Sequence, residues 1–229
     1  MAQSLIGLTV DGPTAVLTLD RSAKLNALNR ELLADLGAAL DRVEQEPDVR
    51  VVVLRGSGRA FSVGLDLTMV ADEGVPADFF ELQERVYRRF EALPAVTVAL
   101  VHGFCLGGAI QLALTADVRI CCEDAKLGMP AVDEGMFPGL MPYRLARTVG
   151  PRVAVRLMLA GGNLTPAEAY EAGLVDHVVP DADAAEALIA PYRTALHAVP
   201  LTKRLIGHGL TGTYREAYDD CLATLKADR

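Results

Sequence analysis

The sequence contains no tryptophan, and aromatic residues of all kinds make up only 5 % of its 229 positions. It has 4 cysteines, and they show neither a CxxC motif nor a Cys/His spacing typical of a metal site; they are Cys105, Cys121, Cys122 and Cys221. The sequence therefore predicts no metal centre and no disulfide framework. Because Cys121 and Cys122 lie in an apolar run, we expect them to be buried structural thiols.

Positive charge is also scarce, because 22 Lys and Arg residues face 30 Asp and Glu residues and leave a net charge of −8. The basic residues are scattered singly, so no basic face for nucleic acid is predicted. The apolar runs are shorter than a membrane span requires, and no charged and then apolar leader precedes the first periodic segment. We therefore expect a cytoplasmic protein that binds neither nucleic acid nor membranes.

The remaining composition is that of a globular protein, with 51 % hydrophobic and 23 % charged residues. Alternating or apolar runs at residues 5–10 and 14–19 predict a β-hairpin around Gly12. Residues 51–54 form a short, continuously apolar run typical of a strand buried on both faces. Amphipathic helices are predicted after Asn29, a candidate N-cap, and from Phe79 to Leu93. The pattern beyond residue 165 is mostly helical and begins with a capping box, Thr165-Pro166-Ala167-Glu168.

Two glycine-containing loops mark the candidate site. The first follows the apolar run 51–54 and covers residues 55–67, at the carboxyl end of a predicted strand, where sites collect in α/β proteins. The second joins the β-like run 96–101 to the helical run 111–116 through Gly107 and Gly108. A glycine pair that opens a helix leaves backbone N–H groups uncovered at the positive end of the helix dipole, and Gly108 allows a ligand oxygen to approach them. The second loop is therefore predicted to bind an oxyanion.

Taken together, the motifs resemble those of the crotonase superfamily, the enoyl-CoA hydratase/isomerase family. The resemblance covers about residues 5–210 and rests on ordered segments at family-like spacing: Lys24-Leu25-Asn26-Ala27-Leu28, residues 60–67, residues 102–111, Ala116-Asp117-Val118-Arg119-Ile120 and residues 164–179. It implies an α/β fold in which a crotonase-like spiral of ββα units occupies residues 1–165. Residues 166–229 would form a C-terminal helical region for oligomerisation, shorter than usual, in a homotrimer or hexamer.

The resemblance also implies the chemistry. Members of this family bind an acyl-CoA thioester and stabilise its enolate, and the two oxyanion donors would be the backbone N–H groups of Leu65 and Gly108. The implied coenzyme-binding residues are Lys24, Leu25, Val63 and Asp66. Coenzyme A would be part of the substrate, with no separate cofactor. Two fixed N–H dipoles stabilise the charge that a thioester carbonyl gains when its α-carbon becomes nucleophilic.

The acid–base residues depart from the family pattern. Hydratases of the family usually carry one glutamate three residues beyond the oxyanion glycine and another twenty residues further on, but these positions hold Gln111 and Ala131. Asp133 and Glu134 follow on the same loop and are candidate replacements, with solvated loop charges as the alternative. A positioned acid or base contributes about 10²–10⁴ in rate, so simple hydration should be slow while enolate stabilisation remains.

Two aromatic residues are weaker candidates. Tyr143 is interpreted as a hydrogen-bond donor in the site or as a packing residue at a helix start. Tyr87 lies on the predicted helix that covers the first loop and is a candidate for the pocket.

Several functions remain open on these grounds. The nominal reaction is enoyl-CoA hydration or isomerisation with non-standard acid–base residues. Decarboxylation fits because loss of carbon dioxide generates the enolate without a base, and hydrolysis of an acyl-CoA or acyl carrier protein thioester fits as well. The alternative from another class is a non-catalytic subunit that binds acyl-CoA.

Overall fold

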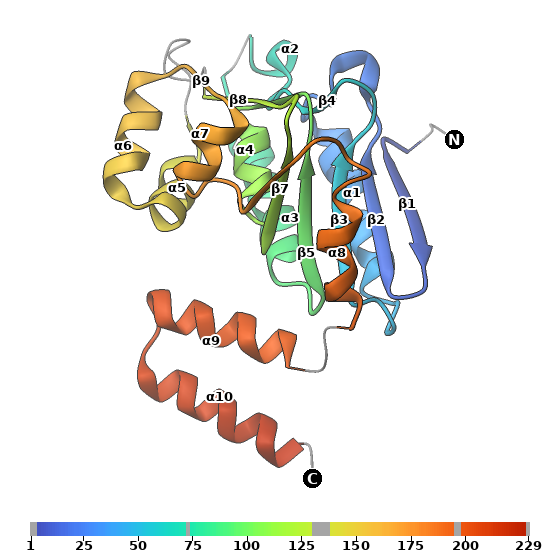
Figure 1. Ribbon diagram of the computed structural model, residues 1–229, viewed down its shortest axis with the longest axis vertical. Helices are drawn as coiled ribbons and strands as arrows, with labels where there is room; N and C mark the ends of the chain where they lie inside the picture. Colours follow the sequence, from blue (N-terminus) through green and yellow to red (C-terminus); the bar gives the residue numbers. More distant parts are fainter. Residues whose placement is uncertain (1–3, 72–73, 130–137, 195–197, 228–229) are drawn as a thin grey trace.

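The computed structural model describes residues 4–71, 74–129, 138–194 and 198–227. The strands in these residues form two sheets, and the second lies across one end of the first, at the top of Figure 1. The first sheet has the order β1-β2-β3-β5-β7-β10, antiparallel between β1 and β2 and parallel elsewhere. Its strands are β1 (Ile6–Asp11), β2 (Thr14–Leu19), β3 (Val51–Gly56), β5 (Val96–Val101), β7 (Val118–Cys122) and β10 (His177–Val179). The predicted hairpin and the buried strand at residues 51–54 are both confirmed.

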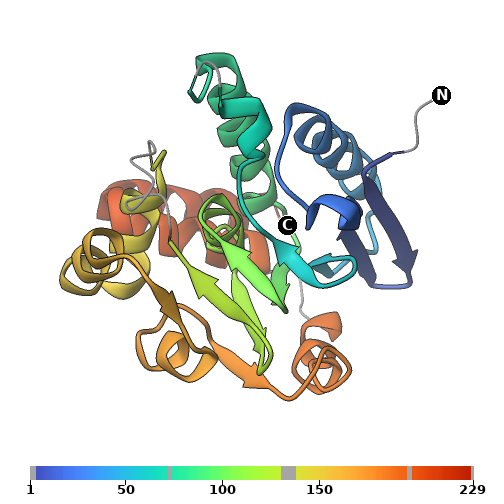
Figure 2. The same ribbon diagram turned by 90° about the horizontal axis from the view of Figure 1, so that it is seen from above.

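Alternation along the strands explains why the first sheet is covered on both faces. Successive side chains of a strand point to opposite faces. Val52 and Leu54 of β3 therefore join the main core, whereas Val51 and Val53 join a second, smaller core. The main core is closed by α1 (Arg30–Val43) and α3 (Ala77–Glu91), and the smaller one by α8 (Glu186–Ile189), which lies on the opposite side of the sheet from α1 (Figure 2).

The second sheet is built from the short strands that follow those of the first. Its order is β4-β6-β8-β9, with β4 (Ala60–Ser62), β6 (Phe104–Leu106), β8 (Lys126–Gly128) and β9 (Asn163–Leu164). The chain passes from β3 to β4, from β5 to β6 and from β7 to β8, and a helix follows each pair before the next turn begins. This repetition is the spiral of ββα units that the sequence resemblance predicts.

Two helices, α1 and α7 (Pro166–Glu171), begin at the caps that the sequence predicts, whereas α3 and α4 (Gly108–Ala113) begin at Ala77 and Gly108, two and three residues before the predicted helical runs. The side-chain oxygen of Asn29 accepts a hydrogen bond from the Leu32 N–H at 2.9 Å and caps α1. The capping box at Thr165 and Glu168 opens α7. The other helices around the spiral are η1 (Ser22–Lys24), α2 (Leu67–Val70), α5 (Met141–Val149), α6 (Pro151–Ala160) and η3 (Ala190–Thr194).

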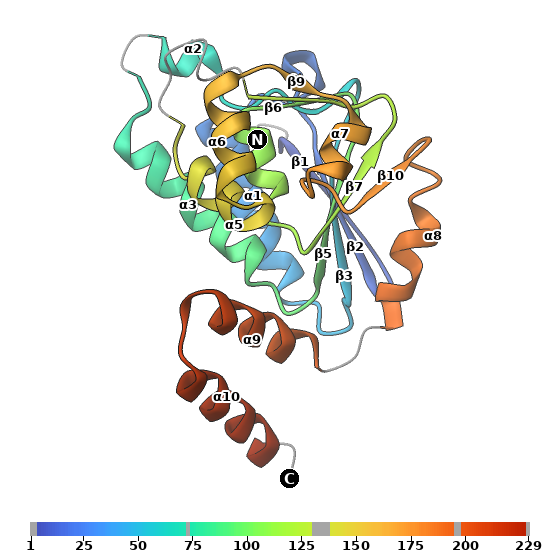
Figure 3. The same cartoon turned by 60° about the vertical axis from the view of Figure 1, so that its left-hand side comes forward.

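The residues from 166 onward form two parts of the fold. The first of them, α7, β10 and α8, complete the spiral, because β10 pairs with β7 in the first sheet. The last helices, α9 (Val199–Thr211) and α10 (Tyr214–Ala227), form a hairpin that projects from the body (Figure 3). Lys203 attaches α9 to the body, because its ammonium group donates to the Leu93 and Ala95 carbonyls and pairs with Asp117 at 2.7 Å. No helix among the described residues has the length and apolar character needed to cross a bilayer.

Candidate active site

A cavity of about 270 Å³ lies where the two glycine loops meet, beside α3 and α5. Its lining is mostly apolar, and Gln83 and Gln111 supply its polar side chains among the described residues. The other lining residues are Ala27, Val63, Leu65, Leu67, Val75, Phe80, Leu106, Gly107, Gly108, Met129, Pro138, Gly139, Met141 and Met158. An apolar cavity with a few polar groups is the usual form of a small-molecule site.

Two backbone N–H groups from different loops border this cavity, those of Leu65 and Gly108. Neither N–H meets a hydrogen-bond acceptor within the described part of the chain. The loops are held close together at Gly64, where a Cβ would lie 2.5 Å from the Leu106 carbonyl oxygen and φ is +83°. Because L side chains rarely adopt that φ, only glycine permits this approach without strain.

At position 108, unlike position 64, the packing of the protein does not require glycine. A Cβ there would make ordinary contacts, 3.6 Å from Leu28 Cδ1 and 3.7 Å from Leu65 Cδ2. Packing therefore leaves room for a methyl group at 108, and the protein itself does not require a glycine there. The preceding residue, Gly107, has φ 50° and ψ −117°, so the turn into α4 depends on position 107 instead.

Asn26 holds the first loop in place and was missed as a functional residue by the sequence reasoning. Its side chain is fully buried and donates to the carbonyls of Ser57, Ala60 and Phe61 at 2.9, 2.8 and 3.2 Å. The backbone carbonyl oxygen of Asn26 accepts from the Ser62 hydroxyl at 2.7 Å. Leu25 and Asn26 both have positive φ. Asparagine is enriched at such left-handed positions, and an asparagine in an irregular polar segment was the one signal in the sequence.

Asp66 braces the loop at the mouth of the cavity. Its carboxylate pairs with Arg21 at 2.6 Å and caps α2 by accepting from the Thr68 hydroxyl and N–H. The hydrogen bond from Thr68, together with Arg21, holds the pKa of Asp66 below its ordinary value, although burial opposes this. Contact of Asp66 with coenzyme A stays a prediction, as it does for Leu25, for Val63 in the cavity wall and for the exposed Lys24.

Gln111 lies at the inner end of the cavity and is tied to a buried ion pair. Its Nε2 donates to Glu84 Oε1 at 2.5 Å, and Glu84 pairs with Arg144 at 3.3 Å. Burial raises the pKa of Glu84 above that of an ordinary glutamate, while Arg144 acts in the opposite direction. These three side chains come from α4, α3 and α5, and the sequence analysis singled out Gln111 alone among them.

Tyr87 of α3 contacts the second loop through a hydrogen bond to its backbone. Its side chain is fully buried, and its hydroxyl donates to the Gly108 carbonyl at 3.2 Å. The apolar surroundings raise the pKa of this phenol far above its ordinary value, so it stays protonated at all physiological pH values. Tyr87 is therefore in place to fix the first turn of α4, and it is not part of the cavity lining.

Other predicted residues lie elsewhere. Tyr143 is 54 % exposed and packs against the Arg147 guanidinium, so the interpretation that it donates a hydrogen bond in the site is wrong. It fails because Tyr143 lies on the outward face of α5, whereas Met141 and Arg144 of the same helix point inward. Ala131, Asp133 and Glu134 fall outside the described residues.

The buried cysteines do not form a reactive site. Cys121 and Cys122 are buried as predicted, and burial raises their thiol pKa values to about 12 and about 11. Such thiols stay protonated and unreactive. In the described part of the chain, no cluster of three or more His, Cys, Asp or Glu side chains is arranged to hold a metal ion.

The sequence profile of the enoyl-CoA hydratase/isomerase family matches residues 11–221. The chain belongs to this family. A probable enoyl-CoA hydratase of Mycobacterium bovis is 35 % identical over 178 residues, which cover 76 % of this chain and 68 % of the relative. A short-chain-enoyl-CoA hydratase of Clostridium acetobutylicum is 32 % identical over 95 % of this chain and 89 % of its own length.

Solved structures of the family show the same fold. A crystal structure of enoyl-CoA hydratase from Thermoplasma volcanium aligns with a TM-score of 0.90 at 30 % identity, covering 98 % of this chain and 92 % of that one. The spiral of ββα units is therefore the crotonase fold. Membership of the enoyl-CoA hydratase/isomerase family supports an acyl-CoA enzyme of the crotonase type.

Proposed function

We propose that the protein binds an acyl-CoA thioester in the cavity and stabilises its enolate with the N–H groups of Leu65 and Gly108. The observation that carries this proposal is that Leu65 and Gly108, from two different loops, line one apolar cavity and that neither backbone N–H has an acceptor among the described residues. When the α-carbon becomes nucleophilic, negative charge moves onto the thioester oxygen. Removing one such donor costs about 10²–10³ in rate in enzymes that stabilise an oxyanion.

Hydration or isomerisation of an enoyl-CoA is the nominal reaction, and the names of the relatives support it. The group at the first acid–base position is the neutral amide of Gln111, which orients a water molecule without accepting its proton near neutral pH. Of the described lining residues, none is ionisable. This favours decarboxylation as a second candidate, since departing carbon dioxide leaves the enolate without a base, and hydrolysis of the thioester is the third.

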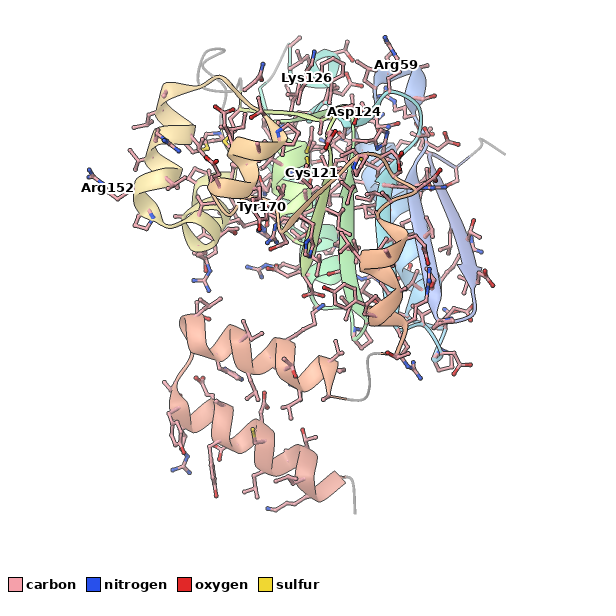
Figure 4. The ribbon with its side chains drawn as sticks, in the orientation of Figure 1. Arg59, Cys121, Asp124, Lys126, Arg152 and Tyr170 are labelled. Carbon is pink, nitrogen blue, oxygen red and sulfur yellow. The ribbon has the colours of Figure 1, made fainter. Side chains whose placement is uncertain are left out.

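The carrier of the acyl group is proposed to be coenzyme A, with acyl carrier protein as the alternative. Lys24 and Arg59 are exposed near the first loop and supply positive charge for phosphate groups, and Figure 4 shows Arg59 at the end of the molecule where the second sheet lies. Arg21 is less suited to this role because its guanidinium already pairs with Asp66. The active form is proposed to be a cytoplasmic homotrimer or hexamer.

Incubation with crotonyl-CoA and with methylmalonyl-CoA, each followed by mass spectrometry, tests the reaction. Conversion of methylmalonyl-CoA to propionyl-CoA would assign decarboxylation. Turnover of crotonyl-CoA at rates typical of hydratases would contradict the claim that Gln111 and the residue at 131 impair hydration. Binding of both thioesters without any turnover would instead favour a non-catalytic subunit.

A pair of variants at Gly108 tests the oxyanion donors. Gly108→Pro removes the N–H at the first position of α4, where proline is compatible with a helix, and should lower turnover by at least about 10²-fold. Gly108→Ala keeps the N–H and makes only ordinary contacts with Leu28 and Leu65, so it measures the cost of the added methyl group alone and should lower turnover less than Gly108→Pro does. Circular dichroism checks that both variants are folded. A folded proline variant with unchanged turnover would refute the assignment of the oxyanion donors.

A further inference from the structure

Three helices meet behind the cavity in a buried polar cluster. Glu84 of α3 is 8 % exposed, Gln111 of α4 is 2 % exposed and Arg144 of α5 is 9 % exposed. Glu91, two turns after Glu84 on α3, lies 3.4 Å from the Arg144 guanidinium but is itself largely exposed. Burying charges and amides in this way is costly unless their hydrogen bonds are made. Among the described residues the buried Arg144 Nε has no partner, so the cluster is held by the Gln111–Glu84 hydrogen bond and by the ion pair of Glu84 with Arg144.

The cluster fixes which end of the Gln111 amide faces the cavity. An ionised carboxylate only accepts hydrogen bonds, so the NH₂ group of Gln111 must point toward Glu84. Burial raises the pKa of Glu84, while Arg144 and the Gln111 NH₂ both favour its ionised form, and the Nε2–Oε1 hydrogen bond has the orientation that an ionised carboxylate requires. The carbonyl oxygen Oε1 then faces Gly139 in the cavity wall, where an added Cβ would lie 3.3 Å from it. Because Gly139 has no side chain, it leaves this oxygen uncovered.

We infer that Glu84 is a positioning residue that holds Gln111 with its carbonyl oxygen toward the cavity, as an acceptor for a hydroxyl group or a water molecule beside the bound thioester. This inference rests on the proposed function and adds a substrate preference to it. The site favours a reacting partner that donates a hydrogen bond, such as water or a hydroxyl at the β-carbon. A carbonyl at the same place would face Oε1 with no proton between the two oxygens.

The first test compares Glu84→Gln with Glu91→Gln. The Glu84 variant keeps the shape of the side chain but accepts and donates, so both orientations of the Gln111 amide become available. We expect its kcat to fall by about 2-fold or more, because about half or more of the molecules would then hold the Gln111 amide reversed. KM for the thioester should change little, because Leu65 and Gly108 still hold the carbonyl. The control, Glu91→Gln, removes the exposed partner of Arg144 and should leave kcat unchanged.

A pH profile separates positioning from a structural role. The polar, charged and titratable groups that interact with Glu84 among the described residues are Gln111, Arg144, Arg88, Glu91 and Tyr87. As the pH falls through the raised pKa of Glu84, the carboxyl group becomes protonated and no longer requires the NH₂ of Gln111. The kcat of the wild type should therefore fall on the acidic side, at a pH above that of an ordinary glutamate, and this decline should be absent in Glu84→Gln.

The exchanged pair, Glu84→Gln with Gln111→Glu, keeps the hydrogen bond and reverses it. It should be better folded than Gln111→Glu alone, in which two carboxylates face each other across one hydrogen bond. It therefore keeps the inference testable if Glu84→Gln fails to fold. An exchanged variant no more stable than Gln111→Glu would overturn the pairing.

A spectroscopic measurement decides the matter independently of turnover. In protein labelled with ¹⁵N at glutamine, the Gln111 NH₂ signal, assigned by its loss in Gln111→Leu, should exchange slowly with solvent and should titrate with Glu84. Both properties should be lost in Glu84→Gln and kept in Glu91→Gln. An unchanged signal in Glu84→Gln would overturn the inference even if thioesters are turned over. Conversely, the expected change with no turnover of any thioester would uphold the positioning and count against the proposed function alone.

Discussion

Asn26 connects the two sides of the first loop through the hydrogen bonds of its side-chain amide. One amide group donates to the Ser57, Ala60 and Phe61 carbonyls, and its oxygen accepts from the Arg21 N–H at 2.9 Å. The left-handed backbone at this position favours asparagine over other L residues. Asn26 therefore helps to position the loop that carries the Leu65 N–H, although Asn26 itself does not line the cavity.

Asn26→Asp should destabilise the protein by at least roughly 3 kcal/mol, measured by urea unfolding. The substitution keeps the size of the side chain but replaces its NH₂ group by a carboxylate oxygen. That oxygen would then face the carbonyl oxygens of Ser57, Ala60 and Phe61 without a proton to donate. Asn29→Asp is the matched control, because aspartate caps a helix as well as asparagine does and should leave the free energy of unfolding nearly unchanged. Equal effects of the two variants would contradict the role assigned to Asn26.

At the scale of elements, local signals in the sequence predicted most of the fold. The hairpin, the buried strand β3, the Asn29 cap and the capping box of α7 each depend on residues close together in the chain, so their patterns are readable without the structure. The oxyanion loops were located through a family resemblance that rests on short motifs. The partners of Glu84 lie 27 and 60 residues away in sequence, and only the packing of α3, α4 and α5 brings them together.

The start of α2 provides a pH-dependent test at the same scale. Since the pKa of Asp66 is lowered on folding, its carboxylate stabilises the folded state at all pH values above its unfolded pKa of about 3.9. This contribution is lost as the pH falls through the lowered, folded pKa. The difference in free energy of unfolding between wild type and Asp66→Asn should therefore be constant near neutral pH and shrink below about pH 4. A difference that does not shrink at acidic pH would contradict the role assigned to Asp66.

For the whole molecule, the α9–α10 hairpin is the part that a single chain does not explain. Its helices have 13 and 14 residues. Isolated helices shorter than about 12–15 residues are only marginally stable in water. Yet several of its large apolar side chains are more than half exposed, among them Ile206 at 61 % and Leu210 at 56 %. Such a surface is typical of a protein interface, which supports the proposed trimer or hexamer.

Light scattering coupled to gel filtration should therefore give a mass of three or six copies of the 24.4 kDa chain. The double variant Ile206→Asp/Leu210→Asp places two charges on the exposed face of α9 and should reduce the mass toward that of one chain, since a desolvated charge has no partner there. Arg215→Gln is the control on the same hairpin: it changes charge at an exposed side chain without removing apolar surface, and the mass should stay that of the wild type. A wild type that is monomeric at micromolar concentration would refute the proposed assembly. The spiral, with its own cores on both faces of the first sheet, should stay folded in the double variant, which circular dichroism would show.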